Sequence, residues 1–354
     1  MIDVNSIPVY EMKNTEKDDF MLNHMNSLTQ FHLNNCDEYK TLMQKFGSVS
    51  SSYSSLFDIP FLPVRLFKSF DLMSVLKEEI VKTMTSSGTT GQDVSKIFLD
   101  KETSALQIKV LSKIMANFIG KARVPMLVID TKKIIDNREM FSARTAGVLG
   151  FSIFGRDVQF ALNDDMSINY KEVENFIKKY QGENILVFGF TFIIWKHFIQ
   201  ELEKTERNLD LSKATLFHGG GWKQIESESV DTVEFKKRIM DSTRISKVHN
   251  YYGMVEQTGS IYVECEMGFF HAPSFSDVII RNHKTHKPEK NGAKGLIQLL
   301  SLIPKSYPGH SILTEDLGTI YGVDNCQCGR KGKYFKVHGR IKSAEIRGCS
   351  DTYT

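Results

Sequence analysis

The chain has 354 residues, of which 41% are hydrophobic and 25% are charged, so it can bury one large core or two of moderate size. Its formal net charge is only +3 and no dense basic face emerges, which argues against nucleic-acid binding. Five cysteines, the lack of a signal-peptide pattern and the shortness of the longest apolar run, residues 185–195, predict a cytoplasmic protein with free thiols and no transmembrane segment.

The first segment, residues 1–55, is expected to be helical and polar. Its apolar residues recur at helical spacing, namely Met21, Leu22, Met25, Leu28 and Phe31. A serine-rich stretch at residues 48–55 predicts a linker or loop. Pro60 and Pro63 follow it and favour an extended chain.

The second segment, residues 56–295, alternates strand and helix patterns. Apolar runs predict strands at residues 80–84, 124–130, 185–190, 216–217 and around 248. Helical patterns lie between them, for example at residues 171–179 and 230–240. This alternation predicts an α/β core. The third segment, residues 296–354, has short strand patterns and glycine-rich turns, which predict a small β-rich subdomain.

The turn after the first of these strands is rich in hydroxyl groups and glycine. Its residues are Ser86, Ser87, Gly88, Thr89, Thr90 and Gly91. Glycines let backbone N–H groups approach an anion and hydroxyls add donors, so this turn is a candidate phosphate-binding loop with Lys96 as a nearby cation. It lacks the Gly-Lys-Ser/Thr ending of a Walker loop. Taken alone, the same composition is also common in plain solvent-exposed loops.

This turn resembles the signature of the adenylate-forming superfamily, which includes acyl-CoA synthetases, luciferases and peptide-synthetase adenylation domains. That signature continues with a proline and a lysine; here the proline is missing and Lys96 comes two residues late. The resemblance implies stacked α/β sheets, like the N-terminal domain of those enzymes, and the use of ATP with Mg²⁺. Lys96 would then offset charge that develops on the phosphates.

Further matches follow in the superfamily's order. The glycine-rich turn and the Tyr-Gly-x-x-Glu segment that hold the nucleotide there correspond to His218, Gly219, Gly220, Gly221, Tyr252, Gly253 and Glu256. By resemblance, Tyr252 stacks on adenine and Glu256 holds Mg²⁺. Asp316 would accept hydrogen bonds from the ribose hydroxyls, and Arg340, near the superfamily's hinge, would contact the nucleotide.

The pair Cys326 and Cys328 lies in a Cys-x-Cys-Gly-Arg sequence. This sequence resembles an element of the phenylacetate-CoA ligase relatives. An alternative is a structural zinc site formed by the two cysteines, His338 and a fourth ligand. One residue between the cysteines is fewer than the two to four that are usual in zinc sites.

A narrower resemblance covers nearly the whole chain. Residues 61–70, 143–150 and 344–351 are similar to the acyl-protein synthetases of bacterial bioluminescence. The chain ends soon after the hinge, so the large mobile C-terminal domain of most superfamily members, with its catalytic lysine, is expected to be absent.

The resemblance implies that ATP activates a long-chain fatty acid, such as tetradecanoate, to an acyl-adenylate. Cys349 would then accept the acyl group as a thioester, since a cysteine near a chain end can sit on a mobile arm. The implied partners are the acyl reductase and acyl transferase subunits of a fatty acid reductase complex, whose aldehyde product serves luciferase. The alternatives are an acyl-CoA ligase and a non-catalytic nucleotide-binding subunit. The aromatic run at residues 188–195 is either an acyl slot or, more commonly for such runs, plain core.

Overall fold

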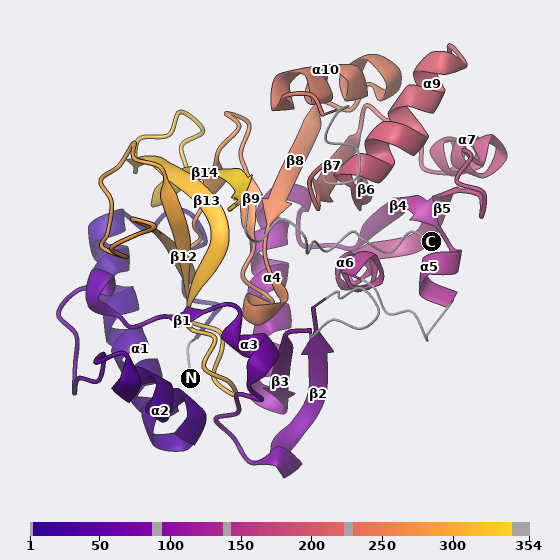
Figure 1. Ribbon diagram of the computed structural model, residues 1–354. Coiled ribbons are helices and arrows are strands. Elements are labelled where there is room, and N and C mark those ends of the chain that lie inside the picture. Colours follow the sequence, from indigo (N-terminus) through magenta and orange to yellow (C-terminus); the bar gives the residue numbers. More distant parts are fainter. Residues whose placement is uncertain (1–2, 87–93, 137–142, 223–228, 342–354) are drawn as a thin grey trace. The chain divides into compact units, whose positions relative to one another are not determined.

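The computed structural model of the chain describes residues 3–86, 94–136, 143–222 and 229–341. These residues fold into two compact units (Figure 1). The described part of unit 1 consists of residues 3–86, 94–114 and 252–341, and that of unit 2 lies within residues 115–251. Residues 1–55 and the residues from 296 onward were expected to be separate segments; their described parts belong to the same unit. The three-segment division of the chain stays a prediction.

Unit 2 contains a parallel sheet in the order β5-β4-β6-β7-β8. Its strands are β4 (Val124–Thr131), β5 (Gly155–Leu162), β6 (Ile185–Phe190), β7 (Ala214–Gly219) and β8 (Lys247–Tyr252). Helices connect them, namely α5 (Lys133–Asp136), α6 (Ala143–Ser152), α7 (Tyr170–Lys179), α8 (Thr191–Ile193), α9 (Gln200–Lys204) and α10 (Thr232–Thr243), and a π-helical turn covers Ile194–Ile199. Every residue of β6 is buried, as the continuous apolar run predicted.

Unit 1 contains a sheet in the order β11-β12-β13-β14-β10-β9, with antiparallel neighbours. Its strands are β9 (Tyr262–Glu264), β10 (Phe270–His271), β11 (Ser276–Arg281), β12 (Gly295–Ser301), β13 (Ser311–Val323) and β14 (Lys333–Arg340). A short parallel strand, β1 (Leu62–Pro63), pairs with β13. The strands β2 (Ile80–Thr85) and β3 (Lys96–Asp100) form a separate hairpin. The antiparallel strands of this sheet thus begin at Tyr262, whereas the sequence pattern predicted a β-rich segment from residue 296 onward.

The helices of unit 1 include α1 (Asn14–Asn35), α2 (Asp37–Lys45), α3 (Leu66–Ser69) and α4 (Lys101–Ile119), the last of which continues into unit 2. Short 3-10 turns cover Leu56–Asp58, Lys77–Glu79 and Val255–Gln257. The buried side chains of Met21 and Met25 on α1 belong to one cluster with Ile279 of β11 and Leu300 of β12. The N-terminal helix is therefore part of the core of unit 1.

A buried ion triad also ties α1 to this sheet. Asp277 on β11 is fully buried and forms ion pairs with Lys17 of α1, at 3.3 Å, and with Lys333 of β14. Burial opposes ionisation of Asp277, but the two ammonium groups outweigh it and hold the pKa of that carboxyl below its ordinary value. The charges compensate one another only as a set, so loss of the central carboxylate leaves two buried cations unpaired.

Two histidines form a second buried polar contact. The ring of His32 on α1 stacks on that of His310, with ring centroids 4.7 Å apart, and Thr29 lies 3.0 Å from His310 Nε2. Both histidines are fully buried. Burial lowers the pKa of His32 to about 3 and that of His310 well below its usual value, so both rings are neutral.

The structure confirms the predicted α/β class. None of the helices within the described ranges combines the length and the hydropathy needed to cross a membrane.

Candidate nucleotide site

Tyr252, Asp316 and Arg340 form one hydrogen-bonded cluster in unit 1. The Tyr252 hydroxyl donates to Asp316 Oδ2 at 2.6 Å, and Arg340 Nε donates to Oδ1 at 3.3 Å. Asp316 on β13 and Arg340 on β14 are direct cross-strand partners, which explains how a separation of 24 residues becomes contact. Burial and the neighbouring Asp316 carboxylate raise the pKa of Tyr252 well above its usual value, so its phenol remains a donor. Each carboxylate oxygen keeps a second lone pair for another donor.

Glu256 lies on the 3-10 turn at Val255–Gln257 and is 5% exposed. Burial raises the pKa of its carboxyl group, while the Ser95 hydroxyl, Lys68 and Arg340 act in the opposite direction. The described residues give the Glu256 carboxylate no ion-pair partner within 4.0 Å. Its backbone is fixed, since the Tyr307 hydroxyl donates to the Glu256 carbonyl at 3.0 Å.

A close approach of glycine keeps this turn in place. A Cβ atom on Gly309 would lie 2.7 Å from the Glu256 carbonyl oxygen and 2.3 Å from the Tyr307 ring. The adjacent Gln257 donates its side-chain amide to the carbonyls of Leu299 and Gly309. The Glu256 carboxylate is thus a buried potential oxygen ligand on a turn that hydrogen bonds hold in place. Such a group suits a hard divalent cation.

The hydroxyl-rich turn connects β2 with β3. Residues 87–93 lie outside the described residues, and with them the predicted positions Ser87, Gly88, Thr89, Thr90 and Gly91. The two ends of the connection are held together, since the Ser86 amide donates to the Ser95 carbonyl and the Ser95 amide donates to Ser86 Oγ, both at 2.9 Å. Lys96 begins β3 and forms an ion pair with Asp71 at 3.3 Å, with both side chains about half exposed. Such a pair exchanges partners at little cost.

The second glycine-rich turn ends β7 in unit 2. Gly220 and Gly221 have φ angles of +86° and +67°, which favour glycine. A Cβ atom on Gly219 would lie 2.8 Å from the Tyr251 ring, and one on Gly220 would lie 2.7 Å from the Phe190 ring. The turn therefore needs glycine at these positions for steric reasons, whatever it binds.

His218, just before this turn, is buried and neutral. Burial, reinforced by Lys236 and His249, lowers its pKa to about 3. Its Nδ1 lies 2.9 Å from Thr191 Oγ1, which itself donates to the Gly219 carbonyl. These contacts fix the carboxyl end of β7, the edge of a parallel sheet at which α/β proteins bind ligands.

The aromatic run at residues 188–195 is buried in the core of unit 2. Phe188 stacks on Phe151 with ring centroids 4.3 Å apart, and Phe188 and Trp195 are at most 2% exposed. The plain-core interpretation therefore accounts for these side chains.

A buried ion pair that was not predicted from the sequence lies at the carboxyl edge of the parallel sheet of unit 2. Asp130, near the end of β4, is fully buried and pairs with Arg144 of α6, which is 5% exposed. Burial raises the pKa of Asp130, while Arg144 opposes the shift. Arg144 lies in the segment 143–150 that carried the family resemblance, and this was the available signal.

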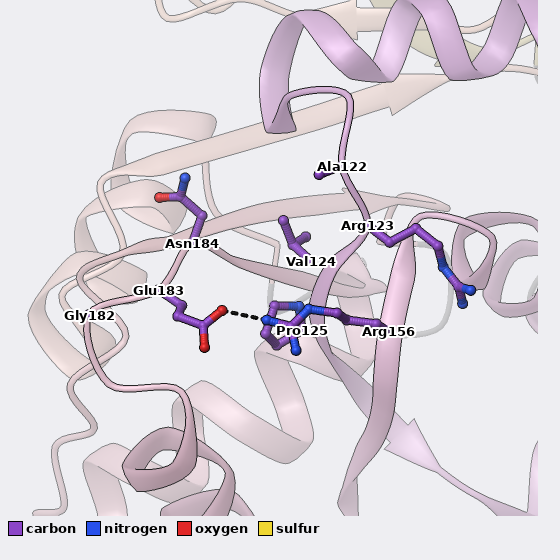
Figure 2. Close-up of a pocket in the computed structure, with 8 residues that line it drawn as sticks. All are labelled: Ala122, Arg123, Val124, Pro125, Arg156, Gly182, Glu183 and Asn184. Carbon is purple, nitrogen blue, oxygen red and sulfur yellow. Dashed lines mark hydrogen bonds and ion pairs between the residues drawn. The ribbon is translucent and has the colours of Figure 1, made fainter.

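The pocket in Figure 2 lies at the opposite edge of the sheet. It is an open depression of about 460 Å³ lined by Ala122, Arg123, Val124, Pro125, Arg156, Gly182, Glu183 and Asn184. Val124 begins β4, and Ile185, directly after Asn184, begins β6, so the depression sits at the amino ends of the strands. Two of its lining residues, Arg156 and Glu183, form an ion pair (Figure 2). Neither the edge nor the lining matches the predicted site.

The acyl-acceptor candidate Cys349 lies outside the described residues. Cys326 and Cys328 lie between β13 and β14, but His338 does not join them: its Nε2 lies 3.0 Å from Thr319 Oγ1. The residues that do meet the two cysteines are Cys265 and His271, both buried, which the sequence analysis missed.

Comparison with known proteins agrees with this architecture. The chain matches the family described as "Acyl-protein synthetase, LuxE" over residues 4–354. The long-chain-fatty-acid–luciferin-component ligase of Aliivibrio fischeri is 23% identical over 328 residues, which cover 90% of this chain and 84% of the relative. The ligase of the same name from Vibrio harveyi is 22% identical over 331 residues, covering 91% and 84%.

Among solved structures, an open conformation of 2-hydroxyisobutyryl-CoA ligase in complex with 2-HIB-AMP and CoA is similar, with a TM-score of 0.73. The sequences are 17% identical, and the similarity covers 97% of this chain and 81% of that one. It shows that the chain has the fold of that ligase. With the family match over residues 4–354, the chain belongs to the acyl-protein synthetase (LuxE) family and is a ligase.

Proposed function

We propose that this protein uses ATP to activate a long-chain fatty acid as an acyl-adenylate and then transfers the acyl group to its own Cys349. The family match along residues 4–354 is the observation that carries this proposal. The names of the two relatives supply the substrate class, a long-chain fatty acid. The 2-HIB-AMP adduct in the similar ligase supports an adenylate intermediate and ATP as the co-substrate.

The nucleoside end of ATP would be held by the Tyr252–Asp316–Arg340 cluster. The Tyr252 ring would stack on adenine, and the second lone pairs of the Asp316 carboxylate would accept the ribose hydroxyls. Arg340 keeps the carboxylate oriented through its 3.3 Å contact. The resemblance to the superfamily assigns phosphate contacts to the turns at residues 86–91 and 218–221, with Lys96 as a cation.

Glu256 fits the role of Mg²⁺ ligand. It is a buried carboxylate with a raised pKa and with no ion-pair partner among the described residues, so a bound divalent cation would stabilise its charged form. Mg²⁺ bound there would offset charge on the ATP phosphates.

The two chemical steps are acyl activation and thioester formation. In the first, a fatty carboxylate oxygen attacks the α-phosphorus of ATP and the bond to pyrophosphate breaks. In the second, the Cys349 thiolate attacks the acyl carbonyl carbon and AMP leaves. A thioester on Cys349 would deliver the acyl group to an acyl reductase partner, with an acyl transferase subunit in the same complex.

The test is intact-mass measurement after incubation of the purified chain with ATP, Mg²⁺ and tetradecanoate. We expect one added tetradecanoyl group that hydroxylamine removes. Cys349→Ser is expected to lose this label and to retain fatty-acid-dependent pyrophosphate exchange, whereas Cys36→Ser, the matched control, keeps both.

Three results would contradict the proposal. A hydroxylamine-sensitive label in Cys349→Ser would refute the acceptor. Catalytic accumulation of free acyl-CoA on addition of coenzyme A would favour an acyl-CoA ligase. Absence of fatty-acid-dependent pyrophosphate exchange in the unmodified chain would favour a non-catalytic nucleotide-binding subunit.

A further inference from the structure

Four potential metal ligands meet in unit 1, and none of them belongs to the Tyr252–Asp316–Arg340 cluster. They are Cys265, His271, Cys326 and Cys328, and their ligand atoms all lie within 4.8 Å of one another. From this arrangement we infer that the protein binds one structural zinc ion through three cysteine sulfurs and one histidine nitrogen. The inference is independent of the proposed ligase chemistry.

The distances fit a tetrahedral zinc site. With Zn–S bonds of about 2.3 Å and a Zn–N bond of about 2.05 Å, tetrahedral angles place two sulfurs about 3.8 Å apart and a sulfur and a nitrogen about 3.6 Å apart. The Sγ atoms of Cys265 and Cys326 are 3.9 Å apart, and Cys328 Sγ is 3.3 Å from His271 Nε2. Both separations lie within about 0.3 Å of the tetrahedral values.

Two tight turns present the sulfurs. The Gly268 amide donates to the Cys265 carbonyl at 2.9 Å, and the Gly329 amide donates to the Cys326 carbonyl at 3.0 Å. Both glycines have positive φ angles, 78° and 87°, so each turn closes in a conformation that favours glycine. The turn from Cys326 to Gly329 explains how cysteines separated by one residue share a site.

The sheet brings the two turns together. His271 lies on β10, between β9 and β14, and its register partners are Val263 and Tyr334. Cys265 directly follows β9, and the pair of cysteines lies in the connection from β13 to β14. A metal ion here would therefore join the β9–β10 connection to the β13–β14 connection. Neither stretch contains a complete ligand set.

Burial and charge also favour a closed site. Cys265 and His271 are fully buried and Cys326 is 8% exposed, so four protein ligands leave little access for a substrate or water. Zn²⁺ with three thiolates and a neutral imidazole carries a net charge of −1. The guanidinium of Arg330 interacts with Cys328 and also pairs with Glu266 at 2.7 Å, which places a cation next to the sulfurs.

The experiment is elemental analysis of the full chain, purified without an affinity metal and dialysed against metal-free buffer. We expect about one zinc per chain, and a drop of at least tenfold in Cys265→Ser, Cys326→Ser and His271→Ala. Cys36→Ser and His338→Gln are matched controls, since Cys36 is a buried cysteine outside the cluster and His338 is the alternative histidine. Both are expected to keep the metal.

A second measurement covers variants that fail to fold. The unmodified protein is titrated with a thiol-specific mercurial while a chromophoric chelator reports zinc. We expect zinc release to track the loss of three thiols, and a lowering of Tm by more than about 5 °C once the metal is removed.

Several outcomes would overturn the inference. These are a metal-free chain that takes up no zinc, iron in place of zinc, retention of zinc in His271→Ala or its loss in His338→Gln. A disulfide between Cys265 and Cys326 would overturn it as well, and would appear as three rather than five free thiols in denaturant.

Discussion

The hydroxyl and the ring of Tyr252 are expected to have separable roles, which Tyr252→Phe and Tyr252→Ala distinguish. The hydroxyl donates to Asp316 Oδ2 at 2.6 Å, a length typical of a charge-assisted bond, and the Asp316 side chain is only 12% exposed. Removing the donor leaves a largely buried carboxylate oxygen without this partner, so Tyr252→Phe is expected to cost about 1.5–3 kcal/mol in the free energy of unfolding.

For the use of ATP, the ring of Tyr252 is expected to matter more than its hydroxyl. Phe keeps the aromatic surface for adenine and frees Oδ2 for a ribose hydroxyl, so KM for ATP stays within about threefold. Ala removes the ring, and stacking of a base on an aromatic side chain is worth about 1–3 kcal/mol, so KM for ATP rises about 5- to 150-fold. Urea titration measures the first quantity, and fatty-acid-dependent pyrophosphate exchange measures the second.

Tyr262→Phe is the matched control. Tyr262 belongs to the same buried cluster, and its hydroxyl donates to the Asp277 carbonyl at 3.1 Å, away from Asp316. We expect a modest loss of stability, about 1 kcal/mol, and an unchanged KM for ATP. If Tyr252→Phe raised KM as much as Tyr252→Ala, the ring would not be the part that recognises adenine and our interpretation of the cluster would be refuted.

Three further predictions concern stability. The folded-state pKa values of His32 and His310 lie below the unfolded value near 6.5, so their contribution to stability is lost as pH falls through 6.5. Between pH 7 and pH 5.5 the pair is expected to lower the free energy of unfolding by about 2–2.5 kcal/mol. A variant with Gln at both positions should lose that share of the pH dependence in urea titrations. Asp277→Asn leaves two buried lysines unpaired and is expected to cost about 3–5 kcal/mol, so an unchanged urea midpoint would contradict the buried triad. Gly220→Ala is expected to lower Tm more than Gly182→Ala, because both glycines have φ of +86° but only the first has an aromatic ring within 2.7 Å of the added Cβ; equal Tm values would show that the turn relaxes.

The regular elements were predictable because their signals are local. The apolar run at residues 185–190 coincides with β6, and the helix expected at 171–179 appears as α7. The strands β9 and β10 of the unit 1 sheet were missed because they have no such local signal. β9 and β10 have three and two residues, too few for periodicity to show, and they are strands because β10 pairs with both β9 and β14.

The candidate site depended on family resemblance rather than on pattern. Nothing local in the sequence states that Tyr252 meets Asp316, since they are 64 residues apart. The matched order of motifs supplied both residues and Arg340, and the structure then added the hydrogen bond and the cross-strand pairing of Asp316 with Arg340. The family resemblance identified the residues of the candidate site, and the strand register determines which of them are in contact.

The cluster of Cys265, His271, Cys326 and Cys328 could be predicted only in part from local pattern and family resemblance. Two of the four candidate ligands, Cys326 and Cys328, were predicted from the sequence as a zinc alternative, together with His338 and an unnamed fourth ligand. His271 is 57 residues away from Cys328, and Cys265 is 61 residues away from Cys326. His338 is on β14 itself, while His271 is on β10, which pairs with β14 in antiparallel register. The sequence did not connect Cys265 and His271 with Cys326 and Cys328, because residues on separate hairpins are brought together by strand pairing, which a single sequence does not state.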